Sequence, residues 1–149
     1  MGRLTLPMGG AIYADAQIPI YSADVHPVYA PLVRPLWEAV ALGAVTVVSS
    51  QLTLLETLVS PLRSGDVLAR RQREGIWTQA NTLLLPITED VLRHAAQLRA
   101  DIPALKTPDA IHAATALLHG CVLFVTNDRG FLRVPGLPLA ILDDLLAAP

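Results

Sequence analysis

Two aspartates near the end of the chain have the positions best suited to chemistry. Asp109 lies in KTPDAIHAATALLHG, where it opens an expected helix, and Asp128 lies in CVLFVTNDRGF, where it follows an expected apolar strand. In a parallel α/β unit, the N-terminus of a helix and the C-terminus of a strand lie at the same edge of the sheet. We therefore expect these two carboxylates to meet, although a whole helix separates them in the sequence.

Two further acids occupy comparable positions. Asp15 ends the apolar run GGAIYA, and Glu56 lies on the helix expected after the strand VTVVSS. Like charges placed together raise one another's pKa and destabilise a fold, whereas a bound cation converts that repulsion into binding energy. Since carboxylates clustered without a neutralising base commonly hold hard divalent cations, the four acids predict a metal site.

Each acid also has a structural alternative. Asp109 complements the helix dipole in a Thr-Pro-Asp start, and Asp128 fits the turn TNDRGF. Asp15 precedes AQIPI, which is not a tight-turn sequence, and Glu56 lies among apolar residues, where an unpartnered charge is costly to desolvate. His112 follows Asp109 by one helical turn and could face the same cleft, but we assign it a packing or capping role.

Apolar runs and helix signals alternate along the chain. We expect strands at 9–14, 45–48, 83–87, 121–125 and 139–142, and helices at 17–23, about 35–42, 51–60, 67–81, 89–101 and 108–120. The expected caps are Ser49 or Ser50, Asp66, Thr88 and Thr107, and Pro61 is the expected stop of helix 51–60. This alternation predicts an α/β fold with a mostly parallel sheet of about five strands and helices on both faces.

The composition favours one domain, 1–149, with a single core. A hydrophobic content of 52% suits a sheet covered on both faces. The net charge of −2 is not that of a protein that grips duplex nucleic acid by bulk charge. The single cysteine, Cys121, excludes an internal disulfide and a cysteine-based zinc site. We expect no targeting segment, no membrane-spanning segment and a cytoplasmic location.

Two groups of arginines have open interpretations. Arg70, Arg71 and Arg73 form a basic cluster that is either a solvated helix face or a set of phosphate contacts. Arg129, which directly follows Asp128, is either an ordinary turn-surface arginine or a phosphate contact.

Four motifs follow one another along the chain: a strand ending before Asp15, SQLTLLE ending at Glu56, TPDAIHAATA from Thr107 and FVTNDRGF from Phe124. In this order they resemble the PIN-domain nucleases, and among these the VapC-like toxins of bacterial and archaeal toxin–antitoxin pairs. The similarity covers about 12–142, and the last two motifs are the specific ones.

The resemblance implies a compact three-layer α/β/α sandwich, PIN-like, and an Mg²⁺- or Mn²⁺-dependent endoribonuclease acting on single-stranded or structured RNA. The acidic quartet of the family is matched by Asp15, Glu56, Asp109 and Asp128. Thr126 matches a hydroxyl residue that often supports this site. Family members are commonly homodimers, and the toxins bind a small antitoxin protein, so the resemblance implies both kinds of partner here.

One position departs from the family pattern. The family often has Asp-x-Asn after the first strand, or a Ser or Thr beside the Asp, whereas this chain has Asp15-Ala16-Gln17. Gln17 can still donate and accept hydrogen bonds through a longer arm, so we count it as a supporting residue. We expect Asp15 and Asp128 to be the central metal ligands, with Glu56 and Asp109 completing the site directly or through water.

The main alternative function is non-catalytic. A PIN-like protein with the altered Asp-Ala-Gln could be a catalytically weak or inactive module for RNA binding or assembly. A metal-dependent phosphatase for small phosphoesters is a more distant alternative, because the Asp-x-Asp-x-Thr motif of one large phosphatase class is absent from the sequence.

Overall fold

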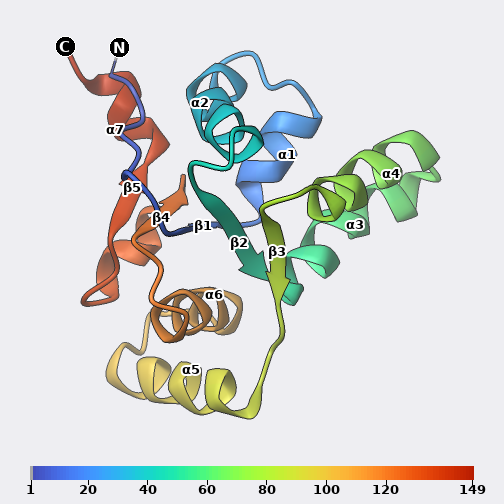
Figure 1. Cartoon of the computed structure of the whole chain (residues 1–149). Coiled ribbons are helices and arrows are strands. Elements are labelled where there is room, and N and C mark those ends of the chain that lie inside the picture. Colours follow the sequence, from blue (N-terminus) through green and yellow to red (C-terminus); the bar gives the residue numbers. More distant parts are fainter. Residues whose placement is uncertain (1) are drawn as a thin grey trace.

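The protein is described by a computed structural model over residues 2–149; Met1, the first residue of the expected domain, lies outside the described residues. Within residues 2–149, five strands form one fully parallel sheet in the order β3-β2-β1-β4-β5. The strands are β1 (Ala11–Ala14), β2 (Thr46–Ser50), β3 (Thr82–Leu85), β4 (Leu123–Thr126) and β5 (Leu139–Ile141). The expected parallel sheet is confirmed, with strand ends shifted by a few residues (Figure 1).

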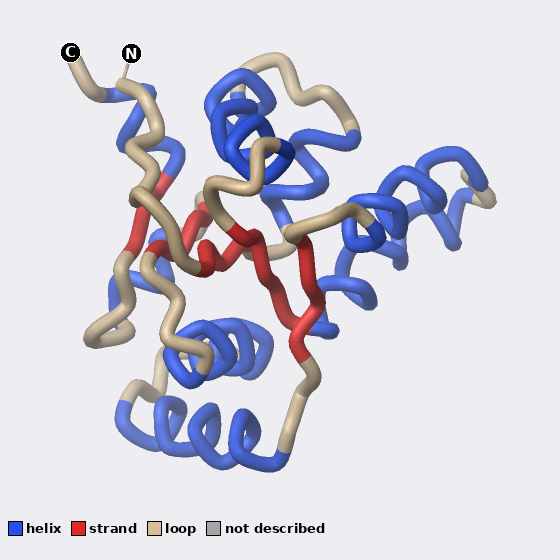
Figure 2. The backbone as a smooth tube through the Cα atoms, viewed as in Figure 1, coloured by secondary structure: helices blue, strands red, loops and turns tan. Residues whose placement is uncertain are grey.

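Helices cover both faces of this sheet, which confirms the expected α/β/α architecture (Figures 1 and 2). The helices are α1 (Gln17–Ala23), α2 (Tyr29–Ala41), α3 (Gln51–Ser64), α4 (Val67–Gly75), α5 (Glu89–Asp101), α6 (Thr107–Leu118) and α7 (Leu142–Ala147), with 3-10 turns η1 (Ile76–Thr78) and η2 (Arg129–Arg133). Helices α5 and α6 pack on one face, and α1, α2 and α7 pack on the other. The α3–α4 hairpin projects beyond the β3 side of the sheet (Figure 1).

The central strand β1 contributes to both cores by the period-two alternation of a strand. Ile12 and Ala14 pack toward α2, whereas Tyr13 packs toward α5 and α6. The same alternation directs Asp15, the residue after β1, toward the α6 side. Across residues 2–149, every helix is too short or too polar to span a bilayer.

Three of the expected caps are present. Ser50 accepts a hydrogen bond from the Leu52 N–H, Asp66 from the Ala69 N–H, and Thr88 from the Val91 N–H. The prediction that Thr107 caps the next helix was wrong, because α6 begins at Thr107 itself. The Thr107 hydroxyl instead accepts a hydrogen bond from Arg99 Nη1 at 2.7 Å, which ties the start of α6 to α5.

Two helix boundaries differ from the expectation. Helix α2 begins at Tyr29 rather than near Pro35, because Pro31 lies in the first turn, where a missing N–H costs nothing. Pro35 removes only the helical hydrogen bond to the Pro31 carbonyl. Because Pro31 is exposed, water can supply the missing donor. Helix α4 ends at Gly75 and passes into η1, whereas the expected helix ran to about residue 81.

Helix α3 also continues through Pro61, where we expected it to stop, and ends at Ser64 before the left-handed Gly65. Pro61 has no N–H, so the carbonyl of Thr57, four residues earlier, loses its helical partner. Arg73 of α4 supplies the missing donor, since its Nη1 lies 2.7 Å from this carbonyl. Arg73 Nη2 also pairs with Asp24 at 3.1 Å, which joins the α3–α4 hairpin to the end of α1.

We predict that Arg73→Ala lowers the free energy of unfolding by about 1–3 kcal/mol, because the carbonyl of the buried Thr57 loses the donor that replaces its helical partner. Urea denaturation measures this change. The matched control is Arg71→Ala, an exposed arginine of the same helix, which should change stability by no more than about 0.5 kcal/mol. Equal losses in the two variants would contradict this role of Arg73.

Candidate active site

The four acids of the predicted quartet come from four separate elements. Asp15 follows β1, Asp128 follows β4, Glu56 lies on α3, and Asp109 lies in the first turn of α6. Strands β1 and β4 are paired, although the chain builds β2 and β3 on the other side of β1 before it returns. The carboxyl edge of a parallel sheet at such a reversal of strand order is where ligands commonly bind.

All four acids line one small pocket of about 110 Å³. Its other lining residues are Ala16, Gln17, His112 and Phe131. A larger hollow of about 400 Å³ beside Trp37 has no acid in its lining, so we do not connect it with the same chemistry. The structure thus brings together the carboxylates that the sequence singled out, while their roles stay a prediction.

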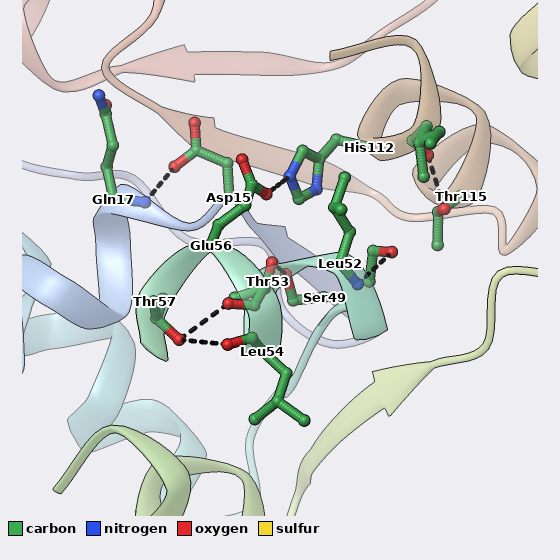
Figure 3. A network of polar contacts seen from close by, with 12 residues as sticks. Asp15, Gln17, Ser49, Leu52, Thr53, Leu54, Glu56, Thr57, His112 and Thr115 are labelled. Atoms are coloured by element: carbon green, nitrogen blue, oxygen red, sulfur yellow. Dashed lines mark hydrogen bonds and ion pairs between the residues drawn. The ribbon is translucent and has the colours of Figure 1, made fainter. Parts of the chain in front are cut away.

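Asp15 is the most buried of the four acids, at 5% exposure. Its Oδ1 accepts a hydrogen bond from the Gln17 N–H at 3.0 Å, and its Oδ2 accepts one from the Thr126 hydroxyl. Burial raises the pKa of Asp15 to about 6, against the opposing effect of the Thr126 hydrogen bond. Gln17 supports Asp15 through its main chain, because its exposed side chain points away from the carboxylate (Figure 3).

Asp128 lines the pocket from the turn after β4, and Asp109 lines it from the first turn of α6. Asp128 Oδ1 accepts a hydrogen bond from the Gly130 N–H at 2.7 Å, so this acid also holds the turn into η2. Thr126 links the two strand-end acids, since its hydroxyl oxygen accepts from the Asp128 N–H at 3.0 Å. Burial raises the pKa of Asp109, and the negative charges of Asp128 and Glu56 raise it further.

Glu56 is hydrogen-bonded to a histidine that lines the same pocket. Its Oε1 lies 2.5 Å from His112 Nε2 (Figure 3). The Nδ1 of the same ring lies 2.6 Å from the Tyr13 hydroxyl. His112 is 2% exposed, so it is buried as the packing assignment requires, and it also lines the pocket. In the sequence, the spacing of one helical turn between Asp109 and His112 had indicated that His112 could line the same pocket.

The donor set fits a hard divalent cation in chemical type, because carboxylate oxygens are the ligands that Mg²⁺ and Mn²⁺ prefer. Over residues 2–149, however, no three acidic, histidine or cysteine side chains converge on a common ion position. Oxygens of Asp15, Glu56 and Asp128 are instead held by protein donors. Side-chain rotation or bridging water would close the gaps, and Mg²⁺ usually keeps several waters.

The four arginines considered as RNA contacts lie outside the pocket lining. Arg129 pairs with Asp144 at 2.6 Å on the surface beside Asp128. Arg70 and Arg71 lie on α4, the first partly buried and the second exposed. Arg73 is buried and bonded to Asp24 and to the Thr57 carbonyl, and these contacts give it a structural role instead of one in contacting phosphate.

Comparison with known proteins agrees with this architecture. The family model of the PIN domain matches residues 12–137. The chain therefore belongs to the PIN-domain family, and the resemblance seen in the sequence is confirmed. No curated protein is significantly similar to the chain in sequence.

Several solved structures share the fold. VapBC2 from Rickettsia felis, bound to a DNA fragment from its promoter, is 18% identical with a TM-score of 0.70, and the match covers 88% of this chain and 98% of that one. FitAcB from Neisseria gonorrhoeae is 21% identical, with a TM-score of 0.68 and coverage of 90% and 99%. VapC20 from Mycobacterium tuberculosis, described as a toxin that cleaves the sarcin–ricin loop, is 18% identical, with a TM-score of 0.67 and coverage of 83% and 95%.

We predict that metal-free protein loses stability as pH rises because of Asp15. Folding raises the pKa of Asp15 from 3.8 to about 6, so between these values the folded state keeps a proton that the unfolded state has released. The free energy of unfolding should therefore fall with pH, by about 2–3 kcal/mol relative to Asp15→Asn, between pH 4 and 7.

Urea denaturation of both proteins in EDTA at several pH values measures this difference. Asp15→Asn is the matched reference, because it keeps the shape of the side chain and cannot ionise. A difference that stays constant from pH 4 to 7 would show that burial does not perturb this carboxyl group.

Proposed function

We propose that the protein is a divalent-metal-dependent endoribonuclease and the toxin of a toxin–antitoxin pair. The observation that carries the proposal is the meeting of four carboxylates, from four separate segments, in one pocket at the carboxyl edge of the sheet. Membership of the PIN-domain family supports a nuclease, and the toxin that cleaves the sarcin–ricin loop supports RNA as the substrate.

Asp15 and Asp128 would hold the Mg²⁺ or Mn²⁺, with Glu56 and Asp109 completing the site directly or through water. A bound divalent ion lowers the pKa of a coordinated water and stabilises negative charge on a phosphate. Thr126 orients Asp15 and contacts the main chain of Asp128, so it fixes the two central carboxylates relative to each other.

The surroundings of the pocket supply groups for RNA. Arg129 lies on the surface beside Asp128 and could exchange its partner Asp144 for a phosphate, because an exposed ion pair of this kind contributes little stability. The exposed side chain of Gln17 lies at the pocket and can donate to a phosphate or a base. Arg70 and Arg71 lie on α4 and would reach only a longer RNA.

We also propose a protein partner, the antitoxin, and a homodimer. Exposed apolar side chains on the α3–α4 hairpin support contact with another protein, because a patch of this kind commonly marks an interface. These side chains are Leu54, Leu55, Val59, Leu62, Val67 and Leu68, with exposures from 37% to 67%. A toxin–antitoxin complex from Klebsiella pneumoniae that shares the fold supports the antitoxin as one such partner.

We predict that the protein cleaves RNA only with Mg²⁺ or Mn²⁺, and that Asp15→Asn or Asp128→Asn lowers the cleavage rate at least about 100-fold. Each substitution keeps the hydrogen-bonding shape of the side chain and removes one negative charge from the metal site. Gel analysis of end-labelled RNA measures the rate, and thermal unfolding shows that each variant is folded.

The control variant is Asp66→Asn, because this acid caps α4 away from the pocket and asparagine caps as well. It should cleave at the wild-type rate. Cleavage that persists in EDTA would overturn the metal dependence. RNA binding without cleavage at any metal concentration would instead favour the inactive RNA-binding module, and turnover of small phosphoesters alone would favour a phosphatase.

A further inference from the structure

A buried chain of hydrogen bonds leads from the middle of the sheet to the pocket wall. It runs from the Ser50 N–H to the Tyr13 hydroxyl, from there to His112, and from His112 to Glu56. We propose that Tyr13 and His112 are positioning residues that hold Glu56 in the orientation in which it contributes to cation binding. This inference rests on the proposed metal-dependent function and assigns that site two residues outside the acidic quartet.

Tyr13 is the fixed end of this chain. It is 0% exposed, and its ring stacks on Phe124 with centroids 4.7 Å apart and planes inclined by 11°. The ring also meets His112 edge-on, at a centroid distance of 5.8 Å. Burial raises the pKa of Tyr13 far above the ordinary range, so the group stays a hydroxyl with a proton to donate.

The direction of the hydrogen bonds follows from Glu56. An ionised carboxylate can only accept, so His112 Nε2 donates to Glu56 Oε1 at 2.5 Å. In a neutral His112 ring, Nδ1 then has no proton and accepts from the Tyr13 hydroxyl at 2.6 Å. The Tyr13 oxygen in turn accepts from the Ser50 N–H at 3.0 Å.

This arrangement restrains a side chain that would otherwise move. Glu56 projects from α3 and is 31% exposed, so without a partner it would sample several rotamers. Within residues 2–149, the hydrogen bond from His112 engages Oε1 alone, so Oε2 stays available to the pocket. Outer groups that orient a ligand in this way commonly change metal affinity 10–100-fold when removed, by the general behaviour of metal sites.

The opposite role is also testable. His112 could act as a latch that withholds Glu56 from the site, since the carboxylates do not converge on one position as they stand. Positioning predicts that loss of the His112 bond weakens metal binding, whereas a latch predicts that it strengthens metal binding. A purely structural role predicts lower stability with unchanged metal affinity.

The experiment is calorimetric titration of Mn²⁺ into the metal-free protein, carried out well below the unfolding temperature. Tyr13→Phe keeps the stacked ring and removes only the hydroxyl, so we expect Mn²⁺ affinity about ten-fold weaker. The matched control is Tyr29→Phe, which loses a hydroxyl bonded to Asp143 outside the pocket and should bind Mn²⁺ like the wild type.

Two substitutions of His112 extend the test. Glutamine can still donate to Glu56 and accept from Tyr13, whereas leucine can do neither, so affinity should fall in the order wild type, His112→Gln, His112→Leu. The control His119→Gln changes an exposed histidine just after the same helix and should have no effect. If leucine prevents folding, the comparison of Tyr13→Phe with Tyr29→Phe still decides the question.

Nitrogen NMR of the imidazole ring gives a readout that does not depend on metal. The His112 ring should show its proton on Nε2 in the wild type, as the hydrogen bond to Glu56 requires, and its Nδ1 signal should shift in Tyr13→Phe because Nδ1 loses its hydrogen-bond donor. Unchanged or tighter Mn²⁺ binding in the variants, or an Nδ1-protonated ring in the wild type, would overturn the positioning role alone. A wild-type protein that binds no Mn²⁺ would overturn the proposed function, and this inference with it.

Discussion

The parallel pairing of β1 with β4 is the constraint on which the site depends. It places Asp15, after the end of β1, against Thr126 at the end of β4, and Thr126 in turn contacts the main chain of Asp128. Both strands are buried between two helical layers, and Thr126 ties the turn that carries Asp128 to the end of β4, so the positions of both acids depend on the core. A functional site built on such rigid elements can hold its groups in place more accurately than one built on loops.

This arrangement places negative charge where water is scarce. Burial raises the pKa of Asp15, and the neighbouring carboxylates add to the effect of burial at Asp109. A protein selected for stability alone would not keep several acids in one pocket. Local destabilisation of this kind is typical of functional sites, where the cost is recovered when a ligand of opposite charge binds.

Glu56 depends on the fold in a different way from the two strand-end acids. It is carried by α3, and Arg73 donates to the carbonyl of the neighbouring Thr57, which Pro61 leaves without its helical partner. Its carboxylate then meets His112 of α6, which is fixed by Tyr13 of β1. Glu56 and the residue beside it are therefore held by two contacts from other segments, one from Arg73 and one from His112. Neither of these residues belongs to the acidic quartet.

The amino-acid sequence by itself determined the alternation of strands and helices, most of the helix caps, and the acids that follow strands β1 and β4. These features are local, since apolar runs, capping side chains and prolines act within about one helical turn or one strand. The four motifs in their order along the chain, with those around Asp109 and Asp128 the specific ones, also indicated the PIN-domain family.

Only the tertiary structure decided which strand lies beside β1, how α3 passes through Pro61, and that Arg73 is buried rather than free to bind phosphate. It also decided that His112 connects Tyr13 to Glu56 and that Gln17 supports Asp15 through its main chain. The physical reason is the same in each case. A hydrogen-bonding group must find a partner when it is buried, and that partner comes from a segment brought close only when the chain packs.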